Sequence, residues 1–421
     1  MFVYLKKILG WFSFFVANIF FYRRLYGTKL GGMVLATLLR NMGVVGVKVG
    51  QHLYSRTDIM KPCALVYLEP FLSFSKTSRY EDVCRMIKDE SLIVDPMVVA
   101  SGSIGQVHLC RIRGDVEVYV LKILHPNVVD EIQNDIKLLR GFVWFFGMMY
   151  RKVQVFDFDK IFSMIEIQTD MIQEYDNLCK ASKNFKHCPH VSICRPILRT
   201  SSYIVMERMR GILLSEYLKD CTQEDSQRIR SLVYAAYLKM TFKDKFNHLD
   251  LHHGNILVEN LNKIQIIDWG LAKRMDRRSR DGMLAFLRAY AYRTLDDTKK
   301  MLRCILIKES KNIGDCAADI YHQTKMVHKN NMNKTLDTMC CCIYEHNLRI
   351  DSEILNYINQ FTHFMNPRKD EDNTQEDNLT YQTHQFIQRD AYWAGQIGYV
   401  VHKLSNIHTD LMKQKQLTST T

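Results

Sequence analysis

The sequence predicts a two-lobed α+β protein in which a strand-rich lobe precedes a mostly helical one. Residues 97–126 alternate apolar and polar side chains around a turn at Gly114 and Asp115, which is typical of antiparallel strands. Residues 192–209 again have the composition of strands, whereas the pattern from Ser215 onward is mostly helical.

Size and composition fit this fold and favour anionic partners. The 421 residues, of which 47% are hydrophobic, suffice for one large domain or two to three smaller ones. The formal charge of +12 and the pI near 9.0 favour nucleotides, acidic lipid headgroups or nucleic acid without choosing among them. Twelve cysteines show no CxxC pairing or regular spacing. We therefore expect a reducing compartment and buried apolar thiols rather than zinc ligands or disulfides.

The first element is an apolar and basic amino-terminal segment. No acidic residue precedes Asp58, and residues 8–22 form an apolar run between two pairs of basic residues. The run is shorter than the roughly twenty residues with which a straight helix crosses a bilayer, but its aromatic and basic flanks can hold it at an interface. We expect contact with an anionic membrane surface, with a buried core helix as the alternative. Whether the segment spans the membrane or lies on it stays open.

Composition divides the rest of the chain into further segments. Amphipathic helices are expected over residues 128–185. The acidic, proline-marked stretch at 366–378 is typical of a solvated loop. The predicted organisation is a membrane-contacting segment, a helical extension, a strand-rich lobe, a helical lobe and a final region with the acidic loop, a helical piece and a polar tail, at residues 1–27, 28–95, 96–208, 209–365 and 366–421.

Three oxygen-bearing side chains are expected to cluster around a short hairpin in the second lobe. Residues 256–258 and 264–267 can pair, which carries Asn255 and Asp268 to one end, with Asp250 on the loop before it. Hard cations such as magnesium prefer such oxygen ligands together with substrate phosphates. Phosphoryl transfer uses an aspartate base, an asparagine metal ligand and a second metal-binding aspartate followed by glycine. The three residues match these roles in order.

The phosphate-binding parts are expected upstream, in the strand region. A loop of small residues at the first turn lets backbone N–H groups approach phosphates, and its members are Ala100, Ser101, Gly102, Ser103, Ile104 and Gly105. Lys122, on the next strand but one, has the place of the phosphate-binding lysine. A lone strand lysine is usually solvated, and a lone small-residue loop is a weak signal. Their joint order is specific.

Two further motifs point to a family. KVGQ at residues 48–51, with SRTD at 55–58, and HLDLHHGN at 248–255 resemble the KxGQ segment and the HxDxHxGN catalytic loop of the UbiB/ADCK family of atypical, protein-kinase-like proteins. The resemblance covers roughly residues 30–300. It implies a bilobal kinase-like fold whose KxGQ extension lies across the nucleotide cleft. It also implies ATP and Mg²⁺ as cofactors, and ATPase or unorthodox kinase activity in ubiquinone or other isoprenoid-lipid metabolism at membranes, in mitochondria by the same resemblance.

The resemblance assigns an acidic partner to the lysine. The family pattern ExDxxxEAxN falls on residues 168–177, which makes Glu174 the partner of Lys122. A frame that begins at Glu174 would put Lys180 in the partner position, where two cations would repel each other. The first frame is therefore preferred.

The same comparison implies roles for the remaining site residues. Lys48, Gly50, Gln51 and Asp170 are expected to gate the cleft. The segment 206–211 is expected to hinge the lobes and to receive adenine, with contacts from Met206 and Glu207.

Several positions depart from the family pattern. Gln168 replaces the glutamate thought to hold Lys48, so the clamp on that lysine is expected to be weaker. Gly102 and Gly105 are read as replacements of alanines, which gives a more flexible loop and makes phosphoryl transfer more plausible. Trp269 replaces a phenylalanine and is expected to pack as an apolar plug.

Other features argue against an ordinary protein kinase. Leu249 stands where an arginine would read a phosphorylated activation loop, His252 stands where a lysine contacts phosphate, and no Ala-Pro-Glu follows. His248 is interpreted as a buried structural histidine that bonds backbone near Asp268. The alternatives are a nucleotide-binding pseudokinase scaffold, a true protein kinase and a nucleic-acid binder. No motif supports the last, so no nucleic-acid partner is expected.

Overall fold

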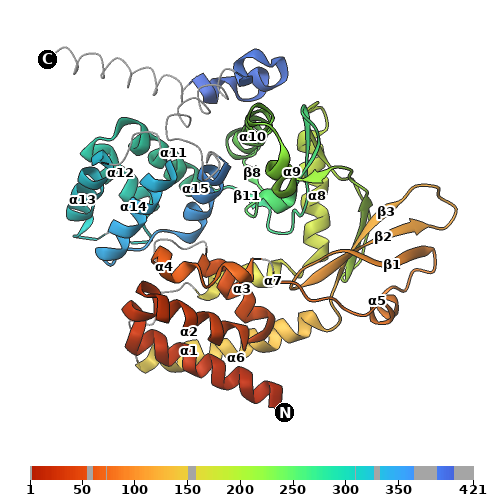
Figure 1. The fold of residues 1–421 in the computed structure, drawn as a ribbon, viewed down its shortest axis with the longest axis horizontal. Coiled ribbons are helices and arrows are strands. Elements are labelled where there is room, and N and C mark those ends of the chain that lie inside the picture. The colour runs from red at the N-terminus through yellow and green to blue at the C-terminus, as the bar shows by residue number, and fades with distance from the viewer. Residues whose placement is uncertain are drawn as a thin grey trace. The chain divides into compact units, whose positions relative to one another are not determined.

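The computed structural model describes residues 2–54, 60–72, 74–149, 158–308, 310–326, 332–364 and 386–402. The chain divides into two compact units. Unit 1 comprises Met1–Cys179 and Cys194–Arg208, and unit 2 comprises Lys180–Ile193 and Met209–Thr421. Both units combine helices with β-sheet, so the predicted α+β class is confirmed (Figure 1). The SRTD motif, the acidic stretch at 366–378 and the tail after residue 402 lie outside the described residues.

Unit 1 begins with a helical extension that is packed through small residues. Its elements are α1 (Phe2–Gly27), α2 (Lys29–Arg40), α3 (Gly43–Tyr54), α4 (Pro62–Leu65) and the 3-10 turn η1 (Glu69–Phe71). A Cβ at Gly31 would lie 2.1 Å from the carbonyl oxygen of Arg24, and one at Gly32 would lie 2.5 Å from that of Ala64. Glycine therefore allows α2 to lie directly against the end of α1 and against α4.

Helix α1 has two apolar faces with different surroundings. Trp11, Phe14 and Phe15 are at most 1% exposed, and the ring of Phe15 stacks on that of Phe146 at 5.3 Å. Residues on the outer face remain about half exposed, namely Leu5, Leu9, Phe12, Phe20 and Phe21. The alternative prediction of a buried core helix therefore holds for the inner face of α1 but not for its outer face. In the described parts of the chain, no helix combines the length and apolar character that crossing a membrane requires.

The sheet of unit 1 has five antiparallel strands in the order β1-β2-β3-β6-β5. Their bounds are Leu92–Ser101, Gly105–Ile112, Tyr119–Leu124, Tyr203–Glu207 and Pro196–Arg199. Val83 of helix α5 (Tyr80–Met86) packs in a core with Leu121, Ile123 and Val205. These buried positions alternate along β3, as expected for a strand with one face in a core.

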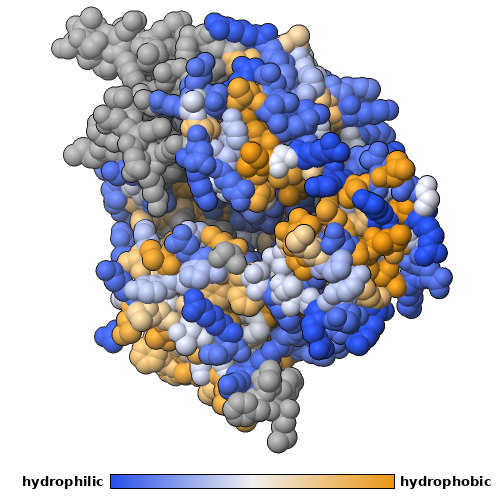
Figure 2. All heavy atoms as spheres, turned by 45° about the vertical axis from the view of Figure 1, so that its right-hand side comes forward, coloured by the Kyte–Doolittle hydropathy of each residue, from blue (hydrophilic) through white to orange (hydrophobic). Residues whose placement is uncertain are grey.

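Strand β1 is an edge strand that exposes apolar side chains. Ile93, Met97 and Val99 are all more than half exposed, and Figure 2 shows hydrophobic residues gathered over this part of the sheet. Pro96 lies inside the strand, where the β1–β2 register shifts between Val94 and Val98. Proline lacks a ladder donor, and the irregularity discourages further strand pairing at the edge.

In the described parts of residues 128–185, three helices follow the first strands, as predicted. They are α6 (Val128–Met149), α7 (Phe158–Ile167) and α8 (Met171–Phe185). Helix α6 packs against α1, α3 and α7. Helix α8 passes through the boundary between the units, because its last six residues belong to unit 2.

Unit 2 has a four-stranded sheet in the order β4-β10-β9-β7, with bounds Val191–Ile193, Lys263–Ile266, Ile256–Asn260 and Ile212–Leu213. Strands β9 and β10 are antiparallel and pair Ile264 with Val258 and Ile266 with Ile256. This pairing confirms the predicted hairpin. A second, two-stranded sheet joins β8 (Phe246–Asn247) to β11 (Lys273–Arg274).

The remaining elements of unit 2 are mostly helical. They are α9 (Leu214–Asp220), α10 (Gln223–Leu238), the π-helical η3 (Lys239–Asp244), the 3-10 turn η4 (His253–Asn255), α11 (Arg277–Tyr292), α12 (Leu295–Ile305), α13 (Ile313–Met326), α14 (Met332–Glu345) and α15 (Ser352–Phe364). A helical piece within residues 386–402 packs Trp393 against the ring of His190 at 6.0 Å. Nε2 of His190 lies 2.7 Å from Oδ2 of Asp390.

Candidate functional site

The predicted phosphate-binding residues lie in unit 1 and centre on a lysine–glutamate ion pair. Lys122 lies on β3, and its neighbours Leu121 and Ile123 are fully buried on the opposite face of the sheet. Its Nζ lies 2.7 Å from Oε1 and 2.9 Å from Oε2 of Glu174 on α8. The Glu174 side chain is only 3% exposed. We call the loop 100–105, Lys122 and Glu174 the lysine site.

The helix that carries Glu174 begins at Asp170. Oδ1 of Asp170 accepts hydrogen bonds from the backbone N–H groups of Ile172 at 3.0 Å and Gln173 at 2.9 Å. Its carbonyl oxygen accepts the N–H of Glu174 at 3.0 Å. Asp170 is therefore the N-cap of α8, and capping fixes the first turn, from which Glu174 projects. The gating role of Asp170 stays a prediction.

The loop between β1 and β2 corrects one expectation. A Cβ at Gly105 would lie 2.5 Å from the carbonyl oxygen of Ile123 on β3. The glycine is thus required for close strand approach, and reading it as an alanine replacement that adds flexibility was wrong. A Cβ at Gly102 would have its nearest neighbouring atom 3.8 Å away, so alanine fits there. The interpretation as a replaced alanine that adds flexibility therefore remains for Gly102 alone.

The KxGQ residues lie in the helical extension of unit 1. The amide nitrogen Nε2 of Gln51 donates to the carbonyl oxygen of Phe71 at 2.8 Å. Gly50 faces the same residue, since a Cβ there would lie 2.9 Å from the Phe71 ring. Both residues thus hold η1 against α3. Lys48 is half-buried on the same helix, which packs against α7, and Gln168 follows α7 with Oε1 buried and without a hydrogen-bond partner among the described residues.

Met206 and Glu207 end strand β6. Met206 is 9% exposed, and its Sδ lies 3.6 Å from Sγ of Cys194. Glu207 binds Arg195 through Oε1 at 3.0 Å and through its backbone N–H at 2.9 Å. The boundary between the two units falls directly after Arg208. It therefore lies within the 206–211 segment predicted to be a hinge.

The predicted metal and catalytic residues lie in unit 2, at one end of the β9–β10 hairpin. We call Asp250, Asn255 and Asp268 the aspartate site. Nδ2 of Asn255 donates to the carbonyl oxygen of Asp250 at 2.9 Å. The N–H of Ile267, which precedes Asp268, donates to the carbonyl oxygen of Asn255 at 3.0 Å. These bonds join Asp250, Asn255 and the residue that precedes Asp268, and so bring the three predicted positions together.

Asp268 and Leu249, the residue before Asp250, have strained backbone. Leu249 has φ of 62° and Asp268 has φ of 60°. Such left-handed conformations are uncommon for residues other than glycine and persist where the surroundings impose them. Here His248 holds both turns, because Nε2 meets the carbonyl oxygen of Ile267 at 2.8 Å and Nδ1 accepts the N–H of Asp250 at 3.3 Å. The structural reading of His248 is confirmed.

Trp269 packs beside His248, with the ring centroids 4.9 Å apart, in the apolar environment predicted for it. It is fully buried, and its ring stacks on that of Phe246 at 6.0 Å. Its indole N–H donates to the carbonyl oxygen of Ile266 at 3.1 Å.

The donor chemistry of the aspartate site fits magnesium. Asn255 is 7% exposed, and the hydrogen bond from Nδ2 assigns its Oδ1 as the acceptor end of the amide. One amide oxygen and the carboxylate of Asp268 are hard ligands, and magnesium completes its coordination with water and substrate phosphates. In the described ranges, no three or more His, Cys, Asp and Glu side chains are grouped so as to hold a metal.

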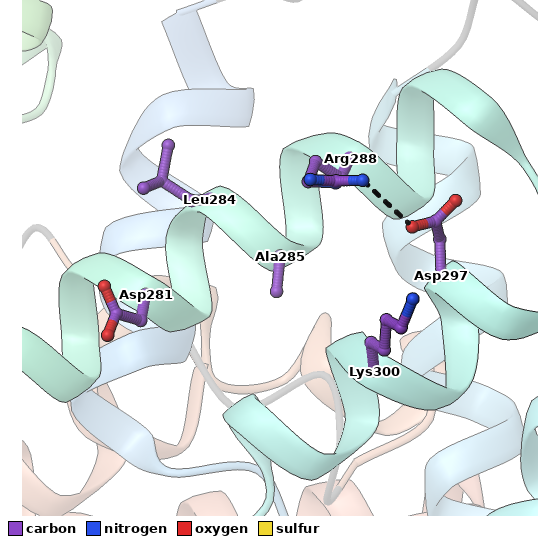
Figure 3. A pocket seen from close by; sticks show the side chains of 6 residues that line it. All are labelled: Asp281, Leu284, Ala285, Arg288, Asp297 and Lys300. Atoms are coloured by element: carbon purple, nitrogen blue, oxygen red, sulfur yellow. Dashed lines mark ion pairs between the residues drawn. The ribbon is translucent and has the colours of Figure 1, made fainter.

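A pocket of about 270 Å³ lies elsewhere in unit 2, between α11 and α12, and contains none of the predicted residues. Figure 3 shows its lining, in which Arg288 and Asp297 face each other with Nη2 and Oδ1 3.7 Å apart. Acidic and basic side chains balance there, with Asp281 and Lys300 completing the charges. The pocket gives no charge preference for a ligand.

Sequence reasoning missed a set of buried polar residues next to the loop 100–105. His125, His108 and Gln106 are each at most 1% exposed. Gln106 bonds His108 directly and is linked to His125 through Ser78. The available signal was a glutamine and a histidine within one mostly apolar strand and a second histidine directly after the next strand.

Comparison with known proteins places these features in context. A profile of the family described as "ABC1 atypical kinase-like domain" matches residues 85–303, a little over half of the chain. The chain is 28% identical over 247 residues to "Probable serine/threonine-protein kinase abkC" of Dictyostelium discoideum, which covers 55% of this chain and 35% of the relative. It is 25% identical over 262 residues to "Probable protein kinase UbiB" of Tolumonas auensis, which covers 58% and 48% respectively.

The chain spans about a third to a half of the length of these two relatives. Among solved structures, it is similar to one described as the complex of Rv3197 with erythromycin from Mycobacterium tuberculosis. That likeness has 21% identity and a TM-score of 0.43, and it covers 58% of this chain and 64% of the other.

Proposed function

The chain belongs to the ABC1 atypical kinase-like family, and on that premise we propose that it is a magnesium-dependent ATPase or phosphotransferase. The family confirms the resemblance that the KVGQ and HLDLHHGN motifs indicated. We propose the UbiB/ADCK type of activity, at a membrane and in isoprenoid-quinone or other lipid metabolism.

The observation that carries the proposal is the ion pair between Lys122 and Glu174. A carboxylate that is 3% exposed needs a partner, and the lysine ammonium supplies one at 2.7 Å. The Lys122 side chain keeps 22% exposure. An ammonium fixed in this way is suited to orient the α and β phosphates of ATP.

The aspartate site supports the second half of the chemistry. Asn255 and Asp268 would hold Mg²⁺, which when bound neutralises phosphate charge and acts as a Lewis acid. Asp250 would orient or deprotonate the attacking water or hydroxyl, since its backbone is held by His248 and by Asn255. The strained backbone at Leu249 and Asp268 would hold the two aspartate carboxylates in position before the reaction, so that they need not move during it.

The outer face of α1 supports membrane contact. It is apolar and about half exposed, and no acidic residue stands before Asp58. Apolar area together with basic residues is the combination by which interfacial helices bind anionic lipid. We propose that this face contacts an acidic lipid surface.

ATP hydrolysis by the purified chain tests the proposal. It is measured with Mg²⁺ alone, with phosphatidylcholine vesicles, and with vesicles that also contain phosphatidylglycerol. The variant Asp268→Asn removes one anionic metal ligand with little change of shape, and we expect a loss of about a hundredfold or more, equivalent to about 2.7 kcal/mol. Asp281→Asn, on the exposed surface of α11 in the same unit, is the matched control and should retain the parent rate.

Three outcomes are informative. Equal hydrolysis by Asp268→Asn and the parent contradicts the proposed metal role. Nucleotide affinity without turnover in every lipid condition favours the pseudokinase alternative. Stimulation by phosphatidylglycerol that is lost when Phe12 and Leu9 are both changed to serine supports lipid contact through α1.

A further inference from the structure

A chain of buried and part-buried hydrogen bonds runs from His108 to the loop 100–105 and ends on the carbonyl oxygen of Gly102. Nε2 of His125 lies 3.0 Å from the carbonyl oxygen of Gly102, and Nδ1 lies 2.8 Å from Oγ of Ser78. The N–H of Ser78 donates to Oε1 of Gln106 at 2.7 Å. Nε2 of Gln106 lies 2.7 Å from Nε2 of His108. All of these residues belong to unit 1.

The partners of His125 fix its tautomer. The carbonyl oxygen of Gly102 can only accept, so Nε2 of His125 carries the proton and donates. Nδ1 is then an acceptor for the hydroxyl of Ser78. Burial lowers the pKa of His125, with the nearby Lys76 charge acting in the same direction and the bond to Gly102 opposing it. The neutral ring with its proton on Nε2 fits this geometry and is favoured by the lowered pKa.

His125 binds the loop at two points. Its backbone N–H donates to the carbonyl oxygen of Ile104 at 2.8 Å, in addition to the side-chain bond to Gly102. The carbonyl oxygen of Gly102 also accepts the N–H of Lys76 at 3.1 Å. The hydroxyl of Ser101 donates to the carbonyl oxygen of Lys76. The carbonyl groups of the loop are therefore directed toward His125 and toward the segment that precedes α5.

This arrangement determines where the next N–H points. In a trans peptide the C=O and the following N–H project in opposite directions, and the described chain has no cis peptide. Because the carbonyl of Gly102 is directed at His125, the N–H of Ser103 is directed away from it. A loop that binds phosphate must turn its N–H groups toward the anion and its carbonyls away.

We propose that His125 is a positioning residue for nucleotide phosphates, which acts by holding the Gly102–Ser103 peptide with its N–H on the phosphate side of the loop. The inference rests on the proposed function, because it assumes that the loop binds ATP. It predicts an effect that depends on phosphate groups and is absent for the nucleoside.

Three substitutions of His125 separate positioning from packing. The amide nitrogen of glutamine reaches the place of Nε2 and can donate to Gly102, whereas the shorter asparagine reaches only the place of Nδ1. His125→Ala removes both bonds. The control is His190→Ala in unit 2, which removes a ring held by Asn262 at 3.0 Å and Asp390 at 2.7 Å without touching the loop.

Titration calorimetry with the full chain and Mg²⁺ compares adenosine with the non-hydrolysable analogue AMP-PNP. We expect His125→Ala and His125→Asn to weaken AMP-PNP binding about tenfold, the effect of one well-placed hydrogen bond, while adenosine affinity changes less than about twofold. His125→Gln should recover most of the AMP-PNP affinity. The control should bind both ligands like the parent.

Each alternative outcome has a distinct meaning. A parent that binds no nucleotide overturns the proposed function. A parent that binds, with His125→Asn and His125→Gln equal to each other, overturns the positioning role alone. Parallel loss of adenosine and AMP-PNP affinity overturns it as well, since a general loosening of unit 1 would explain both. If His125→Ala does not fold, the glutamine and asparagine comparison decides.

Discussion

Lys7 and Asp135, which are 128 residues apart, form a buried ion pair that fastens α1 to α6. Nζ of Lys7 lies 2.8 Å from Oδ2 of Asp135 and 3.0 Å from Oε1 of Glu131. The Asp135 side chain is 3% exposed and that of Lys7 is 10% exposed. A helix anchored in this way is a structural part of unit 1, whatever its outer face contacts.

The ion pair predicts a large loss of stability when one partner is removed. Lys7→Met should lower the free energy of unfolding by about 3 kcal/mol, because it leaves the carboxylate of Asp135 buried without its cation. Urea denaturation measures the change. The exposed neighbour Lys6 provides the control, since Lys6→Met should change stability by less than about 0.5 kcal/mol. The double variant Lys7→Met with Asp135→Leu should regain most of the loss; if it is no more stable than Lys7→Met, the uncompensated charge is not the cause.

The lysine site predicts that charge, not shape, at Glu174 matters for hydrolysis. Glu174→Gln keeps the size of the side chain but removes the anion that holds Lys122, so we expect ATP hydrolysis to fall at least about tenfold. Asp176→Asn, on the same helix, is the matched control. Its partner Arg199 is 41% exposed and Asp176 itself 63%, and exposed pairs contribute under about 1 kcal/mol. Similar rates for both variants would count against the proposed role of the pair.

Much of the fold could be predicted from the alternation of apolar and polar residues and from the residues that favour turns. The hairpin at 256–267 and the strands around Gly114 alternate clearly, and the structure has them where the alternation predicts. Strand β4 has three residues and pairs in parallel with β10. So short a run has no readable period, and a parallel partner more than 70 positions away leaves no local pattern.

In the candidate site, too, some contacts could be predicted from the sequence and others could not. The resemblance to the family motif offered two frames for the partner of Lys122, and the frame that brought two cations together could be rejected. The bonds of His125 to Ser78 and Gly102 could not be predicted, since they join residues 47 and 23 positions away without any repeat. Reading Gly105 as a flexible position failed for a related reason. The need for glycine arises from the backbone of a neighbouring strand, not from its own loop.

The two loop glycines predict opposite responses to alanine. Gly105→Ala should destabilise the chain by about 2 kcal/mol, because the added methyl group meets the Ile123 carbonyl oxygen at 2.5 Å and must displace β3. Gly102→Ala has 3.8 Å of clearance and should leave stability unchanged to within about 0.5 kcal/mol. Chemical denaturation of both variants checks the contrast. Equal losses would show that the strand contact is not what distinguishes the two positions.

Burial of His125 predicts a specific dependence of stability on pH. Folding lowers the pKa of this histidine below its ordinary value near 6.5, mainly through burial, so the unfolded chain binds protons more readily. The stabilisation is present at pH 7 and above, and it is lost as the pH falls from about 6.5 toward the lower folded pKa. His125→Gln cannot titrate, whereas every other group titrates alike in both proteins. The melting temperature of the parent should therefore fall more steeply between pH 7.5 and 5.5 than that of His125→Gln, by an amount that grows as the pH is lowered. If the two melting curves shift in parallel over this range, the ring is not held in its neutral form by the folded chain, and the acceptance of the Ser78 hydroxyl by Nδ1 loses its main support.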